Sequence, residues 1–390
     1  MLKVLSSFGG IEVISKGLNW IYIPFLALVL PAYIFGEIVY YHAFLAVATS
    51  ALYFGQNRAV LMFSSRTYMV RPLFISLAIV LSILLAILLI SYFLSINKAF
   101  FPFVAAFFIV IHNLICLENR VFGNIQRFTV TRLAYVLMRL VIGGGVLYST
   151  KEPLYYFVCE IVAVIVSFFL MYYFTYNENK HENKHENKHE TTQLMRVYFV
   201  FGIPIFIQSV FFALSQSLDR LLLEHFGYGN LLAEYGVIVA ISSSITFIMA
   251  YLSIKYEVEI YRSSEKAIAR EIAGKFLRQS VIFSLGMFPF LLLIYFFYQY
   301  IKGGTVDVLL FTSVFLSSLI MAKFHSFSYF ATYCEKNNMI SKVALVISLL
   351  TIFVTYAFVS NMGRDGIVIA KLLTVAIILG VTDISLRYLK

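Results

Sequence analysis

Charged side chains inside long apolar segments are the residues of this sequence best suited to chemistry. Arg139 and Lys371 each lie within a mostly apolar segment of about twenty residues, the length that crosses a bilayer. A charge at the centre of a bilayer costs roughly 2.5–3.5 kcal/mol on insertion scales, so a retained charge indicates a function or a partner. Such a cation attracts an anion or forms a structural pair, and Glu160 and Asp219 are candidate acids for Lys371.

A first polar stripe occurs near the beginning of the chain. Lys16 and Asn19 follow Glu12 at i+4 and i+7, so the three side chains share one face of a helix. We predict that this face points into the protein and that Lys16 and Asn19 line a cavity. The alternative for Lys16 is a side chain that extends to the nearby membrane surface.

A second polar stripe occurs after the middle of the chain. Gln208, Ser215 and Asp219 fall within about 20° of one another at about 100° per residue, with Gln216 beside them. We predict that this stripe forms a cavity wall with Asp219 and Arg220 at its end. The alternative is that these two residues form a solvated helix terminus.

Arg139 lies beside an unusual run of glycines. It follows Arg132 by seven residues on the same helical face, about 10 Å further along the helix axis, and precedes Gly143-Gly144-Gly145. A deep cation next to a flexible segment is typical of a moving gate, and a purely structural ion pair is the alternative.

Catalytic and metal-binding motifs are absent from the sequence. It contains no P-loop, no His-Glu-x-x-His, no Gly-x-Ser-x-Gly and no paired Cys-x-x-Cys. His181, His185 and His189 recur at four-residue spacing, but no carboxylate or cysteine completes a metal site around them. We therefore expect that the protein is not an enzyme and that it binds neither a metal nor a cofactor.

Membrane helices must position these residues, because 61% of the chain is apolar and only 13% is charged. Eight charge-free runs are long enough to span: 17–36, 38–57, 72–97, 99–117, 197–218, 235–254, 279–301 and 343–363. Four further segments carry an ion in their interior: 132–150 with Arg139, 153–176 with Glu160, 306–328 with Lys323 and 364–386 with Lys371. We predict an all-α polytopic membrane protein with about twelve transmembrane helices.

The distribution of cations predicts the orientation. Of the 30 Lys and Arg residues, 22 fall on one side of a twelve-span arrangement and four fall on the other, namely Lys98, Lys151, Lys302 and Arg364. Cytoplasmic loops carry the excess of Lys and Arg, so both termini are predicted in the cytoplasm. The net charge of +10 is thereby explained without nucleic acid. The inner loop 255–278 is predicted to form a basic amphipathic helix on the inner leaflet.

One long polar interruption divides the chain. Residues 177–195 contain the tetrapeptide Glu-Asn-Lys-His three times, which is typical of a solvated tether. We predict an N-terminal six-helix lobe in 1–176, a cytoplasmic linker in 177–195 and a C-terminal six-helix lobe in 196–390. A short internal repeat, Gly36-Glu-Ile-Val and Gly236-Val-Ile-Val, agrees with two related halves.

Several short motifs resemble one family. Gly17 to Pro31 with Gly36, and then Gly55-Gln56-Asn57-Arg58, are similar to the opening of Wzx-type polysaccharide (O-antigen) flippases of the multidrug/oligosaccharidyl-lipid/polysaccharide (MOP) exporter superfamily. The second half resembles the family in Gly202-Ile-Pro204, Leu218-Asp219-Arg220-Leu-Leu-Leu223, Glu234-Tyr235-Gly236 and Gly363-Arg-Asp-Gly366. The resemblance covers most of the chain but not the linker repeat.

The resemblance implies a MATE-like pair of six-helix bundles that moves an undecaprenyl-pyrophosphate-linked oligosaccharide across the bacterial cytoplasmic (inner) membrane, for O-antigen, capsule or other surface polysaccharide. It also implies a cationic cavity with spans one, two, seven and eight as walls, which carry Lys16, Arg58, Asp219 and Arg220. Membrane lipids, a polymerase and a chain-length regulator are the implied partners, and a Na⁺ or H⁺ gradient is a compatible energy source. The predicted cavity comprises Lys16, Asn19, Arg58, Arg139, Gln208, Gln216, Asp219, Arg220 and Lys371.

Two other functions stay open from the sequence. A multidrug/cation antiporter of the same superfamily would have the same architecture but a cavity dominated by carboxylates. A membrane-embedded glycan-modifying enzyme, such as an acyltransferase or a polymerase, usually carries a large outer loop with acidic or Arg clusters. The longest predicted outer loop has about a dozen residues, around 219–233, which favours transport.

Overall fold

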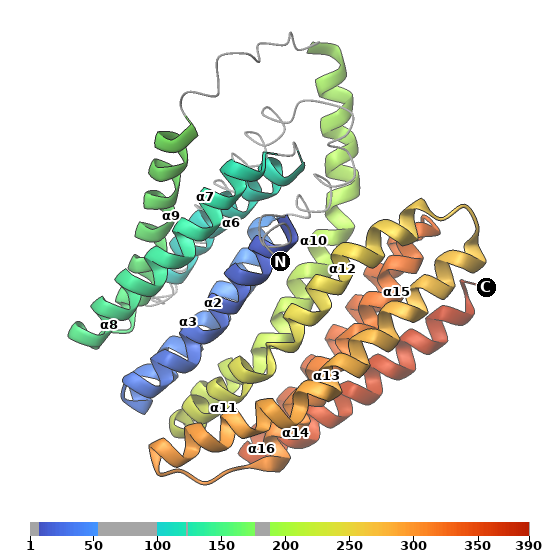
Figure 1. The fold of residues 1–390 in the computed structure, drawn as a ribbon. Helices are drawn as coiled ribbons and strands as arrows, with labels where there is room; N and C mark the ends of the chain where they lie inside the picture. The colour runs from blue at the N-terminus through green and yellow to red at the C-terminus, as the bar shows by residue number, and fades with distance from the viewer. Residues whose placement is uncertain (1–7, 54–99, 122–123, 176–187, 390) are drawn as a thin grey trace. The chain divides into compact units, whose positions relative to one another are not determined.

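The computed structural model describes residues 8–53, 100–121, 124–175 and 188–389, in which helix is the regular secondary structure throughout (Figure 1). The helices are α2 (Phe8–Val29), α3 (Ala32–Tyr53), α6 (Phe100–Val121), α7 (Ile125–Met138), the π-helix η2 (Arg139–Gly143), α8 (Gly144–Thr150), α9 (Leu154–Thr175), α10 (Lys188–His225), α11 (Gly229–Ser242), α12 (Ile245–Arg262), α13 (Lys266–Lys302), α14 (Val308–Leu319), α15 (Met321–Tyr333) and α16 (Asn337–Arg387).

The prediction of an all-α polytopic membrane protein is confirmed. Within the described residues, nine helical segments are long and apolar enough to cross a membrane. Several of these segments contain two helices in direct succession, as α14 and α15 do in the span Val308–Tyr333. The predicted run 72–97 and Arg58 lie outside the described residues.

The chain forms two compact units. Unit 1 comprises residues 1–19 and 41–213, and unit 2 comprises residues 20–40 and 214–390. The end of α2, the turn after it and the beginning of α3 therefore belong to unit 2. The first half of α2 and the second half of α3 belong to unit 1. The predicted division into lobes at 177–195 stays a prediction.

Unit 1 is built around the packing of α7 against α6 and α9, which lie side by side in Figure 1. Tyr135 and Val136 of α7 form a buried apolar cluster with Ala163 and Val164 of α9. This contact fixes the helix faces that carry Arg139 and Glu160, because each of these residues is three or four positions from a member of the cluster.

Unit 2 contains a close helix crossing at the two glycines of the internal repeat. A Cβ atom on Gly36 of α3 would lie 3.3 Å from the carbonyl oxygen of Gly229. A Cβ atom on Gly236 of α11 would lie 2.3 Å from Cγ2 of Val39, which is shorter than any van der Waals contact. The repeat therefore marks a place where small residues let two membrane helices approach closely.

The long helices of unit 2 differ from the prediction in one segment. Residues 255–278 do not form a separate surface helix, because 255–262 complete α12 and 266–278 begin α13. In this segment Ala269, Ala273 and Phe276 are buried, whereas Ile268 is exposed. Small residues make up half of the buried stripe of α13, namely Ala269, Ala273, Ser280 and Ser284, and the other half is Phe276, Leu291, Tyr295 and Gln299.

Candidate functional site

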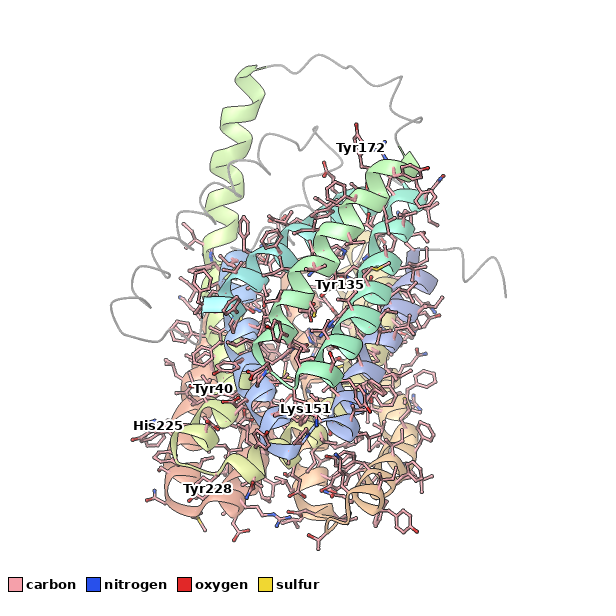
Figure 2. The ribbon with its side chains drawn as sticks, turned by 90° about the vertical axis from the view of Figure 1, so that its left-hand side faces the viewer. Tyr40, Tyr135, Lys151, Tyr172, His225 and Tyr228 are labelled. Carbon is pink, nitrogen blue, oxygen red and sulfur yellow. The ribbon has the colours of Figure 1, made fainter. Side chains whose placement is uncertain are left out.

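Unit 1 contains a buried ion pair between two of the charges found inside predicted spans. Arg139 Nε lies 2.5 Å from Oε1 of Glu160, and the side chain of Glu160 is 1% exposed. Arg139 also donates hydrogen bonds to Oδ1 of Asn19, at 3.0 Å, and to the hydroxyl of Tyr156. Tyr135, labelled in Figure 2, donates to Oε2 of Glu160 at 2.6 Å. The cluster is electrically neutral and its charged groups are held by polar partners.

Arg139 is the first residue of the π-helix η2. A π-helical turn inserts one extra residue into an α-helix and is frequent at functional sites. Here the turn ends at Gly143, the first residue of the glycine run, and Arg139 and Gly143 are both buried. The structure thus pairs the predicted gate cation with an acid and places it in locally irregular helix.

A second cluster in unit 1 includes the first polar stripe. Oε1 of Glu12 lies 3.0 Å from Nη2 of Arg132 and 3.5 Å from Nζ of Lys16. Nη1 of Arg132 donates to Oδ1 of Asn113 at 2.8 Å. One carboxylate therefore serves two cations, and this cluster carries a net charge of +1.

Unit 2 contains a cluster with the same arrangement of charges. Oδ2 of Asp219 lies 2.6 Å from Nζ of Lys371 and accepts a hydrogen bond from the hydroxyl of Tyr235. Oδ1 of Asp219 lies 3.8 Å from Nε of Arg220. One acid again lies between two cations, so this cluster also carries a net charge of +1. Because Asp219 is only 2% exposed and α10 continues to His225, the alternative of a solvated helix end is wrong.

The second polar stripe lies inside unit 2 only in part. Gln216 belongs to unit 2 and accepts a hydrogen bond from Nη2 of Arg220 through its backbone oxygen, while the same nitrogen donates to Ser217 Oγ. Gln208 is buried but belongs to unit 1. Gln208 and Gln216 therefore fall in different units, and Gln216 contacts the Asp219 cluster through its backbone oxygen.

The predicted residues thus fall into separate groups. Arg139 and Asn19 meet in one cluster of unit 1, Lys16 belongs to the other cluster of unit 1, and Asp219, Arg220 and Lys371 meet in unit 2. The ion of the predicted span 306–328 is also paired, because Lys323 Nζ lies 2.7 Å from Oδ1 of Asp383. The four ions in the interior of these predicted spans, Arg139, Glu160, Lys323 and Lys371, therefore each have a partner of opposite charge.

Sequence reasoning missed several residues that hold these ions. Arg132 was counted among the inner-side cations, although it shares the carboxylate of Glu12. Its position seven residues before Arg139, on the same face, was the available signal. Tyr135, which donates to Glu160, and Tyr156, which accepts from Arg139, gave no signal, because the chain contains 27 tyrosines and no pattern marks these two. Tyr235, which donates to Asp219, was marked only as part of the motif Glu234-Tyr235-Gly236.

A further network was not predicted. Nε and Nη2 of Arg364 both lie 2.6 Å from Oδ2 of Asp307, and Nη2 lies 3.9 Å from Oε1 of Glu234. Glu234 also accepts hydrogen bonds from the hydroxyl of Tyr295 at 2.8 Å and from Nε2 of Gln299 at 3.2 Å. This network joins α11, α13 and α14 to the bend of α16, where Gly363 has a positive φ of 53°.

Solved structures define the fold of the whole chain. An inward-facing multidrug resistance MATE family transporter of the MOP superfamily matches with a TM-score of 0.62 and 14% identity over 96% of this chain and 95% of its own. The lipid II flippase MurJ, in an inward closed conformation, matches with a TM-score of 0.65 and 13% identity over 98% of this chain and 87% of its own. The eukaryotic MATE transporter AtDTX14 matches with a TM-score of 0.62 and 14% identity over 98% of this chain and 94% of its own.

The TM-scores over nearly the whole chain show a shared fold, at identities of only 13–14%, and no family model and no curated protein matches the sequence. The chain is therefore a multi-pass membrane protein with the fold of MATE transporters and MurJ.

Proposed function

We propose that this protein is a flippase for a lipid-linked oligosaccharide. It moves an undecaprenyl-pyrophosphate-linked repeat unit from the inner to the outer leaflet of the bacterial cytoplasmic membrane, for the synthesis of O-antigen, capsule or another surface polysaccharide. One observation carries the proposal: Glu12 and Asp219 are each shared by two cations, so each unit holds a cluster with an excess positive charge among membrane helices.

The excess charge points to an anionic substrate. Burying a charge among membrane helices costs free energy. A second cation beside an existing ion pair adds to this cost, because no second acid neutralises it. In a low-dielectric cleft the same excess attracts an anion far more strongly than it would in water. A diphosphate that links a lipid to a glycan is such an anion, while its lipid tail remains in the bilayer.

The fold supports the mechanism. Proteins of this fold include MurJ, whose own substrate is lipid II, and several multidrug transporters. We propose alternating access, in which the two units expose the cations first to one leaflet and then to the other. A Na⁺ or H⁺ gradient or the consumption of product outside supplies the direction, and a polymerase and chain-length regulator act on the flipped product.

A cation antiporter is the nearest alternative function. Such a transporter needs acidic groups that release and rebind cations, and Asp219 is a buried acid of the required type. In the described residues, however, Asp219 already faces Lys371 at 2.6 Å and has Arg220 beside it. This local excess of positive charge favours an anion over a cation as the transported species.

Deletion of the gene in its host tests the proposal. Lipid-linked repeat units are expected to accumulate in the inner leaflet, and surface glycan is expected to fall; a plasmid copy should restore both. Lys371→Ala should fail to restore export although it inserts in the membrane at wild-type level.

Three outcomes would contradict the proposal. Unaltered surface glycan in the deletion strain excludes this transport role. Increased drug sensitivity with normal glycan favours the antiporter. Turnover of a glycan substrate by purified protein without a second compartment favours a membrane-embedded acyltransferase or polymerase.

A further inference from the structure

The cluster of Glu12, Lys16, Arg132 and Asn113 has features of an anion site that is closed by its own acid. Both cations approach the same carboxylate oxygen, Oε1 of Glu12, at 3.0 Å from Arg132 and 3.5 Å from Lys16. The pair with Lys16 is long, and the Lys16 side chain keeps 31% exposure. A single carboxylate oxygen therefore holds two cations, one of them loosely.

Arg132 has unused capacity to bind an anion. Its Nη1 is fixed by Oδ1 of Asn113 at 2.8 Å, and its Nη2 donates to Glu12 at 3.0 Å. Its Nε–H is buried and has no hydrogen-bond acceptor in the part of the chain that the structure describes. A buried donor without an acceptor carries a free-energy penalty, which an incoming phosphate oxygen removes.

We propose that Lys16 and Arg132 bind the diphosphate of the transported lipid, and that Glu12 is an internal counter-ion which this diphosphate displaces. The inference rests on the proposed function and names the part of the substrate that this cluster recognises. A diphosphate diester carries two negative charges, which match the two cations once Glu12 has moved away.

The position of Glu12 permits this exchange. Glu12 lies in the second turn of α2, which begins at Phe8, and its side chain is 19% exposed. A change of rotamer is therefore sufficient to withdraw the carboxylate from Arg132. In the empty state Glu12 spares the protein two unpaired cations, whose burial without a partner would be strongly destabilising.

The neighbouring Arg139 differs in how its acid is held. Glu160, Asn19 and Tyr156 all bond its guanidinium group, and its acid is 1% exposed with a second bond from Tyr135. An anion would have to replace a buried, fully bonded carboxylate there. The geometry thus assigns anion exchange to Glu12 and a structural role to Glu160.

Binding of inorganic pyrophosphate to the purified full-length protein in lipid nanodiscs tests the inference by isothermal titration calorimetry. Glu12→Gln removes the competing charge and should lower the Kd of pyrophosphate about fivefold, the size expected from losing a partly exposed ion pair. Lys16→Ala and Arg132→Ala should each raise the Kd at least about tenfold. Glu271→Gln, which breaks the exposed pair of Glu271 with Lys275 on α13, is the matched control and should leave the Kd unchanged.

Glu12→Asp guards against a folding defect in Glu12→Gln. It keeps the negative charge but shortens the side chain by one methylene, so its Kd should lie between those of wild type and Glu12→Gln. The inference is overturned if the Kd of pyrophosphate is unchanged or higher in both Glu12→Gln and Glu12→Asp. It is also overturned if Lys16→Ala and Arg132→Ala both bind pyrophosphate as tightly as the wild type.

This measurement is separate from export. Pyrophosphate binding with the expected variant order, in a protein whose deletion leaves surface glycan unaltered, would retain the anion site and reject the flippase. Loss of export on deletion, without pyrophosphate binding at this cluster, would retain the flippase and reject the site.

Discussion

Replacement of Lys371 gives the most direct test of the ion cluster in unit 2. Lys371→Met keeps much of the side-chain volume but leaves Asp219, which is 2% exposed, without its contact at 2.6 Å. Breaking a buried pair by removing one partner typically costs about 3–5 kcal/mol. Asp219 retains the hydroxyl of Tyr235 and the more distant Arg220, so we expect a loss of about 3 kcal/mol, at the lower end of this range.

A double-mutant cycle separates this pair from unrelated destabilisation. Asp219→Asn alone should also be destabilising, because it leaves Lys371 without its carboxylate. The double variant Asp219→Asn/Lys371→Met should be less destabilised than the sum of the two single variants, with a coupling energy of about 1–3 kcal/mol. The free energy of unfolding can be measured by far-ultraviolet circular dichroism in mixed micelles titrated with sodium dodecyl sulfate.

Two results would refute this reasoning. A coupling energy within about 0.5 kcal/mol of zero would mean that Asp219 and Lys371 do not form the pair described here. Lys275→Met, which breaks the exposed pair with Glu271, should have no measurable effect, and an effect as large as that of Lys371→Met would show that charge loss alone destabilises the protein. In export assays Lys371→Ala should abolish transport, whereas Lys371→Arg should retain part of it.

Further predictions concern unit 1, the bend of α16 and the linker. Arg139→Met should cost about 3–5 kcal/mol because it strands the buried Glu160, and a combined Arg139→Met/Glu160→Gln variant should recover part of this stability but not export, as measured by the same unfolding and glycan assays. Gly366→Ala should lower the yield of folded protein, because a Cβ atom there would lie 2.1 Å from a backbone carbonyl oxygen, whereas Gly380→Ala in the same helix meets nothing within 4 Å and should be neutral or stabilising. Equal yields from these two alanine variants would contradict the steric explanation. Deletion of 179–189 should leave export nearly intact, and loss of export at normal protein level would indicate a docking or regulatory role for the repeat.

The sequence determined the fold class because membrane insertion depends on local composition. A helix crosses a bilayer when about twenty consecutive residues are mostly apolar, and this property can be read without knowledge of any contact. The same reasoning identified the costly ions, including Arg139 and Lys371. It failed where helices continue beyond an apolar run, as α13 does from Lys266, because charged residues lower the hydropathy of 266–278 although Ala269, Ala273 and Phe276 are buried there.

The pairing of the ions was decided only by the tertiary structure. The sequence offered Glu160 and Asp219 as equivalent partners for Lys371, and the structure gives Asp219 to Lys371 and Glu160 to Arg139. Residues that meet in one cluster are separated by up to 152 positions, so no helical spacing relates them. The sequence thus determined that these charges need compensation, because burial of a charge is costly wherever it occurs. Only the packing of distant helices decided which acid compensates which cation, because that depends on the faces that the helices turn toward one another.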